Sequence, residues 1–183
     1  MKPVPFKAVL DANVLYPFTL RDTLLRAASA GLFQICWTAQ ILEETCRNLV
    51  TAGVMSAEKS VRLRAVMEQA FPEAMVIGYK KLILSMRNQK KDRHVAAAAV
   101  KAGADIIVTS NLKDFRELPD GIKARSPDDF LCSVFGLDPD GIVELLKEQA
   151  ADLRKPPRSF EDLLNGLEKI VPRFTANIRR SIT

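Results

Sequence analysis

The stretch from residue 92 to residue 109 constrains the fold of this chain more than any other. Asp92 opens an alanine-rich helix that runs to Ala102, and Gly103 follows where glycine commonly ends a helix. The next segment, residues 105–109, carries an unbroken apolar run instead of alternating apolar and polar residues. Strands of that kind are buried on both faces, as in parallel sheets. The stretch therefore predicts an α/β fold.

The same alternation of strands and helices runs through the first 136 residues. Strands are predicted at residues 4–10 and 32–37, with a shorter one at residues 74–79. Helices are predicted between the strands, with three N-caps: Thr38, Ser56 and Ser126. This order of elements indicates a parallel α/β sheet.

The character of the chain changes after Gly136. Residues 137–183 contain three helical segments, with a hinge at Lys155-Pro156-Pro157. We therefore expect two parts, a domain over residues 1–136 and a helical C-terminal extension over residues 137–183. The extension could pack onto the first part, or it could bind a partner or RNA.

The composition is that of a water-soluble domain. Of the 183 residues, 48% are hydrophobic and 27% are charged, which are ordinary values for a globular protein. The N-terminus lacks the apolar region of a secretory signal, and no apolar run reaches transmembrane length. The three cysteines form no CxxC pair and are expected to be reduced thiols. We expect a cytoplasmic protein with no membrane partner.

The net charge of +5 lies entirely in the first 137 residues. That part has 19 basic and 14 acidic residues, whereas the remainder has eight of each. A basic surface of this kind suits a protein that binds a phosphate backbone. A modest basic excess is also common in proteins where it only aids solubility, so charge alone leaves both interpretations open.

Four carboxylates stand at the ends of predicted elements, and they carry the functional argument. Asp11 ends the first strand, and Asp114 follows the strand at residues 105–109. Glu44 lies beside the buried stripe of a helix, and Asp92 opens another helix. Ligands bind at the carboxyl ends of the strands in open α/β sheets, so the four can converge there. Converged carboxylates hold hard divalent cations.

Each of these acids also has a simple structural explanation. Asp11 could cap the turn after its strand, and Asp92 could cap its helix, a role worth about 1 kcal/mol. Glu44 could be a solvated helix charge, and Asp114 could belong to an ordinary polar loop. The neighbouring Asn13 cannot transfer a proton, which disfavours a phosphatase that uses Asp11 as its nucleophile. The single histidine, His94, excludes sites built on several histidines.

Taken in order, these segments resemble the PIN-domain family, in its bacterial branch of VapC-type toxins. The resemblance covers about residues 4–136, and the C-terminal tail, with Arg154-Lys155-Pro156-Pro157, also resembles an extension carried by one subgroup. The matching segments are Asp11-Ala12-Asn13-Val14-Leu15-Tyr16-Pro17, Arg21-Asp22, Trp37, Glu43-Glu44, Arg47-Asn48-Leu49, Asp92-Arg93-His94-Val95 and Thr109-Ser110-Asn111-Leu112-Lys113-Asp114-Phe115.

The resemblance implies a three-layer α/β/α fold and a Mg²⁺- or Mn²⁺-dependent endoribonuclease in which a metal-activated water attacks the phosphodiester. The implied catalytic and metal-binding residues are Asp11, Glu44, Asp92 and Asp114, with Asn13, Thr109 and Asn111 in support. The implied partners are RNA, a cognate antitoxin protein and a second copy of the chain.

Four basic residues near the acids are candidates for contacts to RNA phosphates: Lys90, Lys91, Arg93 and Lys113. Relatives often carry acids at the positions of residues 89–91, so this chain departs from the family there. An alternative is a catalytically inactive module of the same fold that binds nucleic acid or protein. The intact set of four acids argues against that alternative, because carboxylates without a metal repel phosphate.

Overall fold

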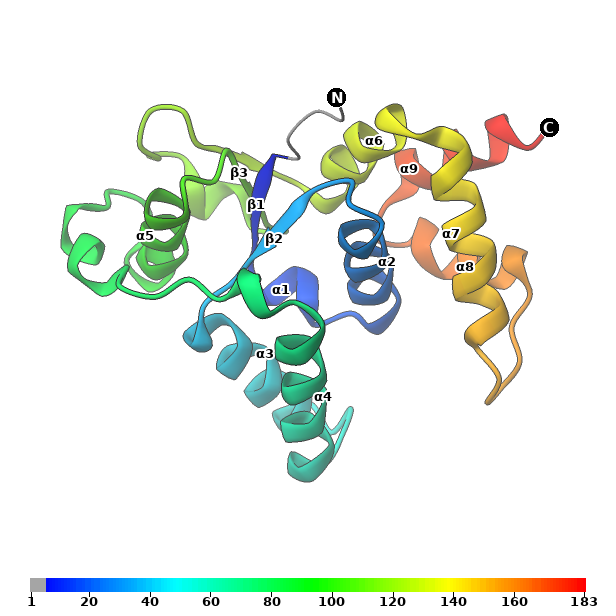
Figure 1. The fold of residues 1–183 in the computed structure, drawn as a ribbon, viewed down its shortest axis with the longest axis horizontal. Helices are drawn as coiled ribbons and strands as arrows, with labels where there is room; N and C mark the ends of the chain where they lie inside the picture. The colour runs from blue at the N-terminus through cyan, green and yellow to red at the C-terminus, as the bar shows by residue number, and fades with distance from the viewer. Residues whose placement is uncertain (1–5) are drawn as a thin grey trace.

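A parallel sheet lies at the centre of the computed structural model, which describes residues 6–183 (Figure 1). Its strand order is β2-β1-β3-β4. The strands are β1 (Lys7–Leu10), β2 (Gln34–Cys36), β3 (Ile106–Val108) and β4 (Lys123–Arg125). In the register, Val9 of β1 lies between Cys36 and Ile107. The first two residues of the predicted strand 4–10 lie outside the described residues.

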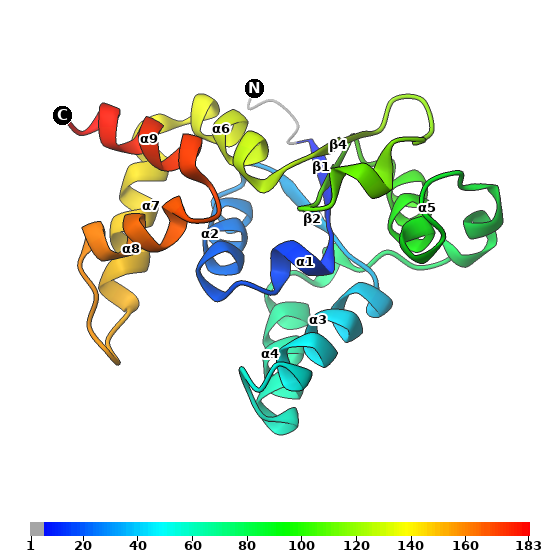
Figure 2. The ribbon, with the colours of Figure 1, turned by 180° about the vertical axis from the view of Figure 1, so that it is seen from behind.

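Helices cover both faces of this sheet, so the predicted three-layer α/β/α fold is confirmed. Helix α5 lies on one side of the sheet and α2 on the other, in both views of the ribbon (Figures 1 and 2). The helices of this part are α1 (Ala12–Leu15), α2 (Phe18–Ser29), α3 (Ala39–Thr51), α4 (Ala57–Ala70), α5 (Arg93–Ala102) and α6 (Pro127–Leu137). Within residues 6–183, no helix is long and apolar enough to cross a membrane.

The predicted strand at residues 74–79 is wrong. Met75 makes a single parallel bridge to Trp37, and the chain then turns at Gly78, whose φ is +75°. A tight 3₁₀ turn at Pro72–Ala74 precedes the bridge, so only a short extended segment is left to pair. Strand β4 was not predicted, because its three residues carry no apolar run.

Small residues let α5 approach the sheet closely. Its central residues 95–99 are all fully buried, and four of the five are alanine. A second group of core residues is aromatic: the rings of Phe33 and Phe130 meet edge to face with centroids 4.9 Å apart. Phe6 meets the same Phe130 ring at 5.9 Å. This aromatic cluster attaches α6 to the sheet.

The C-terminal helices pack on α2 and α6. They are α7 (Pro139–Asp152), α8 (Phe160–Glu168) and α9 (Pro172–Ser181). Helices α7 and α8 contact α2, and α9 contacts α6. A polar contact lies inside this interface: the Thr23 hydroxyl donates to Oε1 of Gln149 at 2.9 Å, and both side chains are fully buried. The predicted domain boundary after residue 136 stays a prediction.

Candidate active site

Asp11 lies at the carboxyl end of β1 and is only 5% exposed. Its Oδ1 accepts a hydrogen bond from the backbone N–H of Ala12 at 2.8 Å, so it caps the short helix α1. Its Oδ2 accepts from the Asn13 side chain and from the Thr109 hydroxyl, each at 2.8 Å. Burial raises the pKa of Asp11 despite these hydrogen bonds. Asp11 is thus both a cap and a buried carboxylate held in one orientation.

The loops after β1 and β3 are joined through Asn13 and Thr109. Oδ1 of Asn13 accepts from the backbone N–H of Ser110 at 2.9 Å, and its Nδ2 donates to the Thr109 hydroxyl at 3.1 Å. That hydroxyl also accepts from the backbone N–H of Asn111 at 3.1 Å. Asn111 joins this network through its backbone, whereas the residue itself is exposed.

Asp92 occupies the N-cap position of α5 without capping it. Its side chain makes no cap hydrogen bond, and its buried Oδ2 has no hydrogen-bond partner. Burial and the neighbouring carboxylates of Asp11 and Asp114 raise the pKa of Asp92 to about 6. Asp92 therefore lies in a poorly solvated region of negative charge, and helix capping does not explain why a carboxylate is found there.

Asp114 lies in a 3₁₀ turn (η4, Leu112–Phe115) that follows β3 in the chain. Its Oδ2 is also buried without a hydrogen bond. The Lys91 ammonium lies 3.0 Å from this oxygen and forms an ion pair with it. The same ammonium lies 3.8 Å from Oδ2 of Asp92. Lys91 thus faces the acids.

Glu44 is held on α3 by the buried His94. Nε2 of His94 lies 3.3 Å from Oε1 of Glu44, and the Gln40 side chain donates to the same oxygen at 3.4 Å. Burial would raise the pKa of Glu44, but His94, Gln40 and Arg47 outweigh it and lower the pKa. The sequence does not predict that His94 positions an acid. A local sign of that role is that His94 lies two residues after Asp92, in the first turn of α5.

The four acids fit a divalent cation by their chemistry, but they form no ready-made cage. Among residues 6–183, no three His, Cys, Asp or Glu side chains are close enough together to hold a metal ion. Two buried carboxylate oxygens, on Asp92 and Asp114, have no hydrogen-bond partner, and hard divalent cations bind such oxygens. Besides burial, the negative charges of Asp11 and Asp114 raise the pKa of Asp92, and a bound cation would offset those charges.

A basic pocket of about 490 Å³ adjoins Asp114. Three of its cations, Lys90, Arg93 and Lys113, were predicted as phosphate contacts, and two more, Arg87 and Arg116, were not. Arg93 is held in place because its Nε donates to the backbone oxygen of Asn88 at 3.1 Å. These five side chains come from two segments, residues 87–93 and 113–116. A backbone hydrogen bond joins the segments, from the Gln89 N–H to the Asp114 carbonyl at 3.0 Å.

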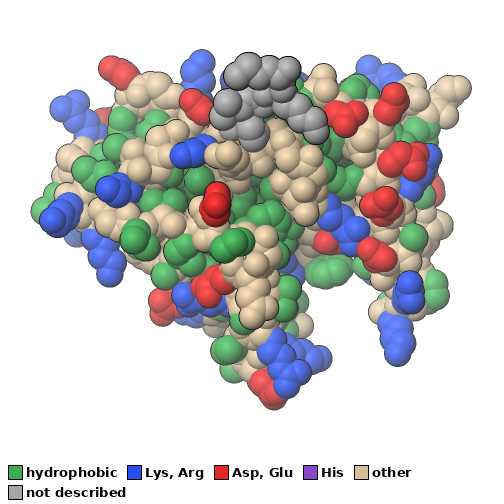
Figure 3. Space-filling model, viewed as in Figure 1, with side chains coloured by type: hydrophobic (Ala, Val, Ile, Leu, Met, Phe, Trp, Pro, Cys, Tyr) green, Lys and Arg blue, Asp and Glu red, His purple; other side chains and the backbone are tan. Residues whose placement is uncertain are grey.

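Basic side chains also predominate on the surface at this end of the molecule. On the face in Figure 3, Lys and Arg outnumber Asp and Glu at the end formed by α5 and the segment before it, and further Lys and Arg side chains gather at the lower tips of the molecule. Acidic and basic side chains mix over α7 and α8. This distribution agrees with the charge difference between the two parts of the sequence.

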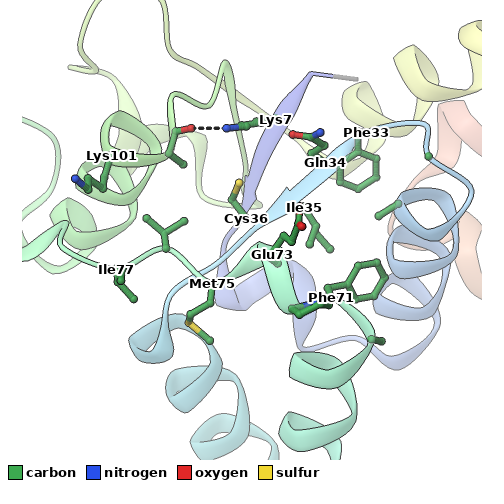
Figure 4. A pocket seen from close by; sticks show the side chains of 17 residues that line it. Lys7, Phe33, Gln34, Ile35, Cys36, Phe71, Glu73, Met75, Ile77 and Lys101 are labelled. Carbon is green, nitrogen blue, oxygen red and sulfur yellow. Dashed lines mark hydrogen bonds between the residues drawn. The ribbon is translucent and has the colours of Figure 1, made fainter. Parts of the chain in front are cut away.

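A separate cavity of about 750 Å³ runs along the outer edge of β2 (Figure 4). Cys36, Phe71 and Met75 line it, and Lys7 at its upper rim donates to the Ala102 carbonyl at 3.0 Å. None of the four predicted acids is among its lining residues. We therefore assign the candidate site to the acids and not to this cavity.

Replacing Asp92 with Asn is expected to stabilise the metal-free protein. Because the pKa of Asp92 is raised to about 6 by burial and by Asp11 and Asp114, the folded state binds more protons than the unfolded state between about pH 4 and 6. The parent should lose stability as the pH rises through that range. At pH 7 the Asp92→Asn protein should be more stable by roughly 1–3 kcal/mol. Urea unfolding in EDTA at pH 3.5 to 7.5 measures the difference.

The exposed Asp120 provides the matched control for this prediction, since Asp120→Asn removes the same charge from a side chain that is exposed to solvent. Its stability should follow that of the parent at each pH. A stability difference between Asp92→Asn and the parent that does not change with pH would contradict the assigned electrostatics.

Two family models match the chain. The first, described as a PIN domain, matches residues 7–113, and the second, described as a VapC50 C-terminal domain, matches residues 127–180. A curated relative from Mycobacterium tuberculosis (strain ATCC 25618 / H37Rv), described as "Putative ribonuclease VapC50", is 41% identical over 110 residues. That match covers 58% of this chain and 65% of the relative, which is less than two thirds of its length. No solved structure matches the chain.

Proposed function

This chain belongs to the PIN-domain family, and from that premise we propose that it is an endoribonuclease, the toxin of a toxin–antitoxin pair. The observation that carries the proposal is the set of acids that follow β1, follow β3 and open α5. Asp11, Asp92 and Asp114 lie close enough to raise the pKa of Asp92 to about 6, together with burial. Neighbouring carboxylates of this kind bind divalent cations.

Asp11 and Asp92, with Glu44 directly or through water, would hold one Mg²⁺ or Mn²⁺ ion. Such an ion, when bound, makes a water molecule more acidic and offsets negative charge on the phosphate. Asn13 and Thr109 fix the direction of the Asp11 carboxylate through the hydrogen bonds at its Oδ2. His94 keeps Glu44 turned toward the same site. No side chain becomes covalently attached to the substrate.

The basic pocket beside Asp114 would hold RNA phosphates that flank the cut. Its five cations are Arg87, Lys90, Arg93, Lys113 and Arg116. Each contact between a cation and a phosphate releases counterions, so binding should weaken as salt rises. Because the pocket adjoins Asp114, a strand of RNA seated there would pass the acids.

Two protein partners belong to the same proposal. A toxin of this kind needs a cognate antitoxin that blocks the acidic site, and we expect the chain to form a homodimer. The similarity to a relative described as a putative VapC50 ribonuclease and the match of residues 127–180 to the VapC50 C-terminal domain support a VapC-type protein.

Metal removal tests the proposed activity. The purified chain should cleave single-stranded RNA in Mg²⁺ or Mn²⁺, stop in excess EDTA, and regain activity when Mn²⁺ is added in excess of the chelator. Gel analysis of an end-labelled RNA measures cleavage, and sequencing of the cut ends identifies the target. A contaminating metal-independent ribonuclease would remain active in EDTA, which provides the internal control.

Either of two results would contradict this function. Cleavage by the pure protein that EDTA leaves unchanged would exclude a role for the metal. RNA binding without cleavage in any divalent metal would instead identify the inactive nucleic-acid-binding module.

A further inference from the structure

The Lys91 ammonium lies between two carboxylates that come from different segments of the chain. It is 3.0 Å from Oδ2 of Asp114 and 3.8 Å from Oδ2 of Asp92. Both oxygens are buried, and no other hydrogen-bond donor is assigned to either of them. The ammonium therefore supplies positive charge to both carboxylates.

The backbone keeps Lys91 close to this position. Residues 90–92 form a 3₁₀ turn (η3, Lys90–Asp92), closed by a hydrogen bond from Asp92 N–H to the Gln89 carbonyl at 2.9 Å. The N–H of Gln89 donates in turn to the Asp114 carbonyl at 3.0 Å. The start of this turn is therefore tied to the segment that carries the acid, and the lysine side chain spans only the remaining gap.

The Lys91 side chain carries a positive charge and remains accessible to solvent. An ordinary lysine ammonium is protonated at neutral pH. The side chain is 61% exposed, whereas those of Asp92 and Asp114 are 17% and 11% exposed. An accessible side chain therefore supplies the positive charge beside these two mostly buried acids.

We propose that Lys91 acts as a tethered cation between Asp92 and Asp114, so that the acidic site binds one divalent ion, on its Asp11 side, instead of two. This inference rests on the proposed function, since it concerns the metal content of the same site. A second divalent ion near Asp114 would meet a like charge within a few ångströms. At the surface of a protein, a unit charge at about 4 Å changes the affinity for an ion by roughly tenfold or more.

Manganese binding without RNA tests this inference. Isothermal titration of the parent with Mn²⁺ should give one ion per chain. The Lys91→Gln protein should bind a second ion, with an affinity at least about tenfold higher than any second site in the parent. Electron paramagnetic resonance should then detect a coupled pair of ions, because paired catalytic metals lie roughly 3.5–4 Å apart. The coupled signal should be absent from the parent.

Lys101→Gln is the matched control, because it removes an exposed lysine from the last turn of α5. It should bind Mn²⁺ as the parent does. Thermal melting in EDTA should show that both variants fold. Two ions bound to the parent, or identical titrations of the parent and Lys91→Gln, would overturn the inference.

The proposed nuclease function fails by a different result. If the parent binds one Mn²⁺ and Lys91→Gln binds two, but neither cleaves RNA, the role of Lys91 stands and the nuclease proposal falls. If no Mn²⁺ binds to any of the three proteins, the metal-dependent function and the role of Lys91 are both overturned.

Discussion

Replacing Asp11 with Asn should reduce RNA cleavage at least about 100-fold, which corresponds to about 2.7 kcal/mol of transition-state stabilisation. The carboxamide oxygen can still accept the Ala12 hydrogen bond, but the variant lacks the negative charge that would hold a cation. Its amide group also faces two donors, the Asn13 side chain and the Thr109 hydroxyl. Single-turnover cleavage of an end-labelled RNA in Mn²⁺ measures the loss.

The control for this variant is Asp105→Asn. It removes an exposed acid at the amino end of β3, whereas Asp11 lies at the carboxyl end of β1. It should cleave RNA at a rate close to that of the parent. Urea unfolding of Asp11→Asn shows whether the protein still folds. A folded Asp11→Asn protein that cleaves RNA as fast as the parent would remove Asp11 from the mechanism.

Replacing Phe130 with Ala should lower the free energy of unfolding by about 3–5 kcal/mol. The Phe130 ring is buried and meets both Phe33 and Phe6 edge to face, so the substitution leaves a cavity and loses two aromatic contacts. The variant also weakens the attachment of α6 to the sheet. Urea unfolding followed by circular dichroism measures the change.

The exposed Phe18 offers a comparison with the same chemistry. Phe18 is 56% exposed, and its cation–π contact with the buried Arg21 is worth about 1–2 kcal/mol. Phe18→Ala should therefore cost less than Phe130→Ala. Equal losses from the two variants would mean that the aromatic cluster contributes no more than a surface contact.

Local signals predicted most of the elements. The hydroxyls of Thr38 and Ser126 cap α3 and α6 as expected, since a cap depends only on residues within one turn. Strand β4 escaped prediction because its exposed and half-buried residues, Lys123–Arg125, pair with β3 through the backbone alone. Pairing of that kind depends on a neighbour far away in the sequence, which no local pattern records.

The same distinction applies to the candidate site. Asp11, Asp92 and Asp114 could be predicted because each stands at or near an element end, where the fold class brings side chains together, whereas Glu44 lies in the middle of α3 and was predicted from its place beside the buried stripe. The direction in which the Lys91 side chain points could not be predicted, because a lysine at this position could face either the two acids or the basic pocket. His94 was missed as a positioning residue because its partner, Glu44, lies on another helix.

The Thr23–Gln149 contact has a consequence for how uniquely the C-terminal helices are attached. An interface made only of leucine and valine side chains tolerates sliding or rotation of one helix against another at little cost. Here the Gln149 amide also donates to the Thr19 carbonyl at 3.1 Å, so both ends of one buried amide have partners on α2. Any other alignment of α7 would leave the Gln149 amide buried without these partners, at about 1–3 kcal/mol for each unpaired group, whereas the Thr23 hydroxyl also lies 2.9 Å from the Thr19 carbonyl of its own helix. The contact therefore favours a single register of α7 against α2.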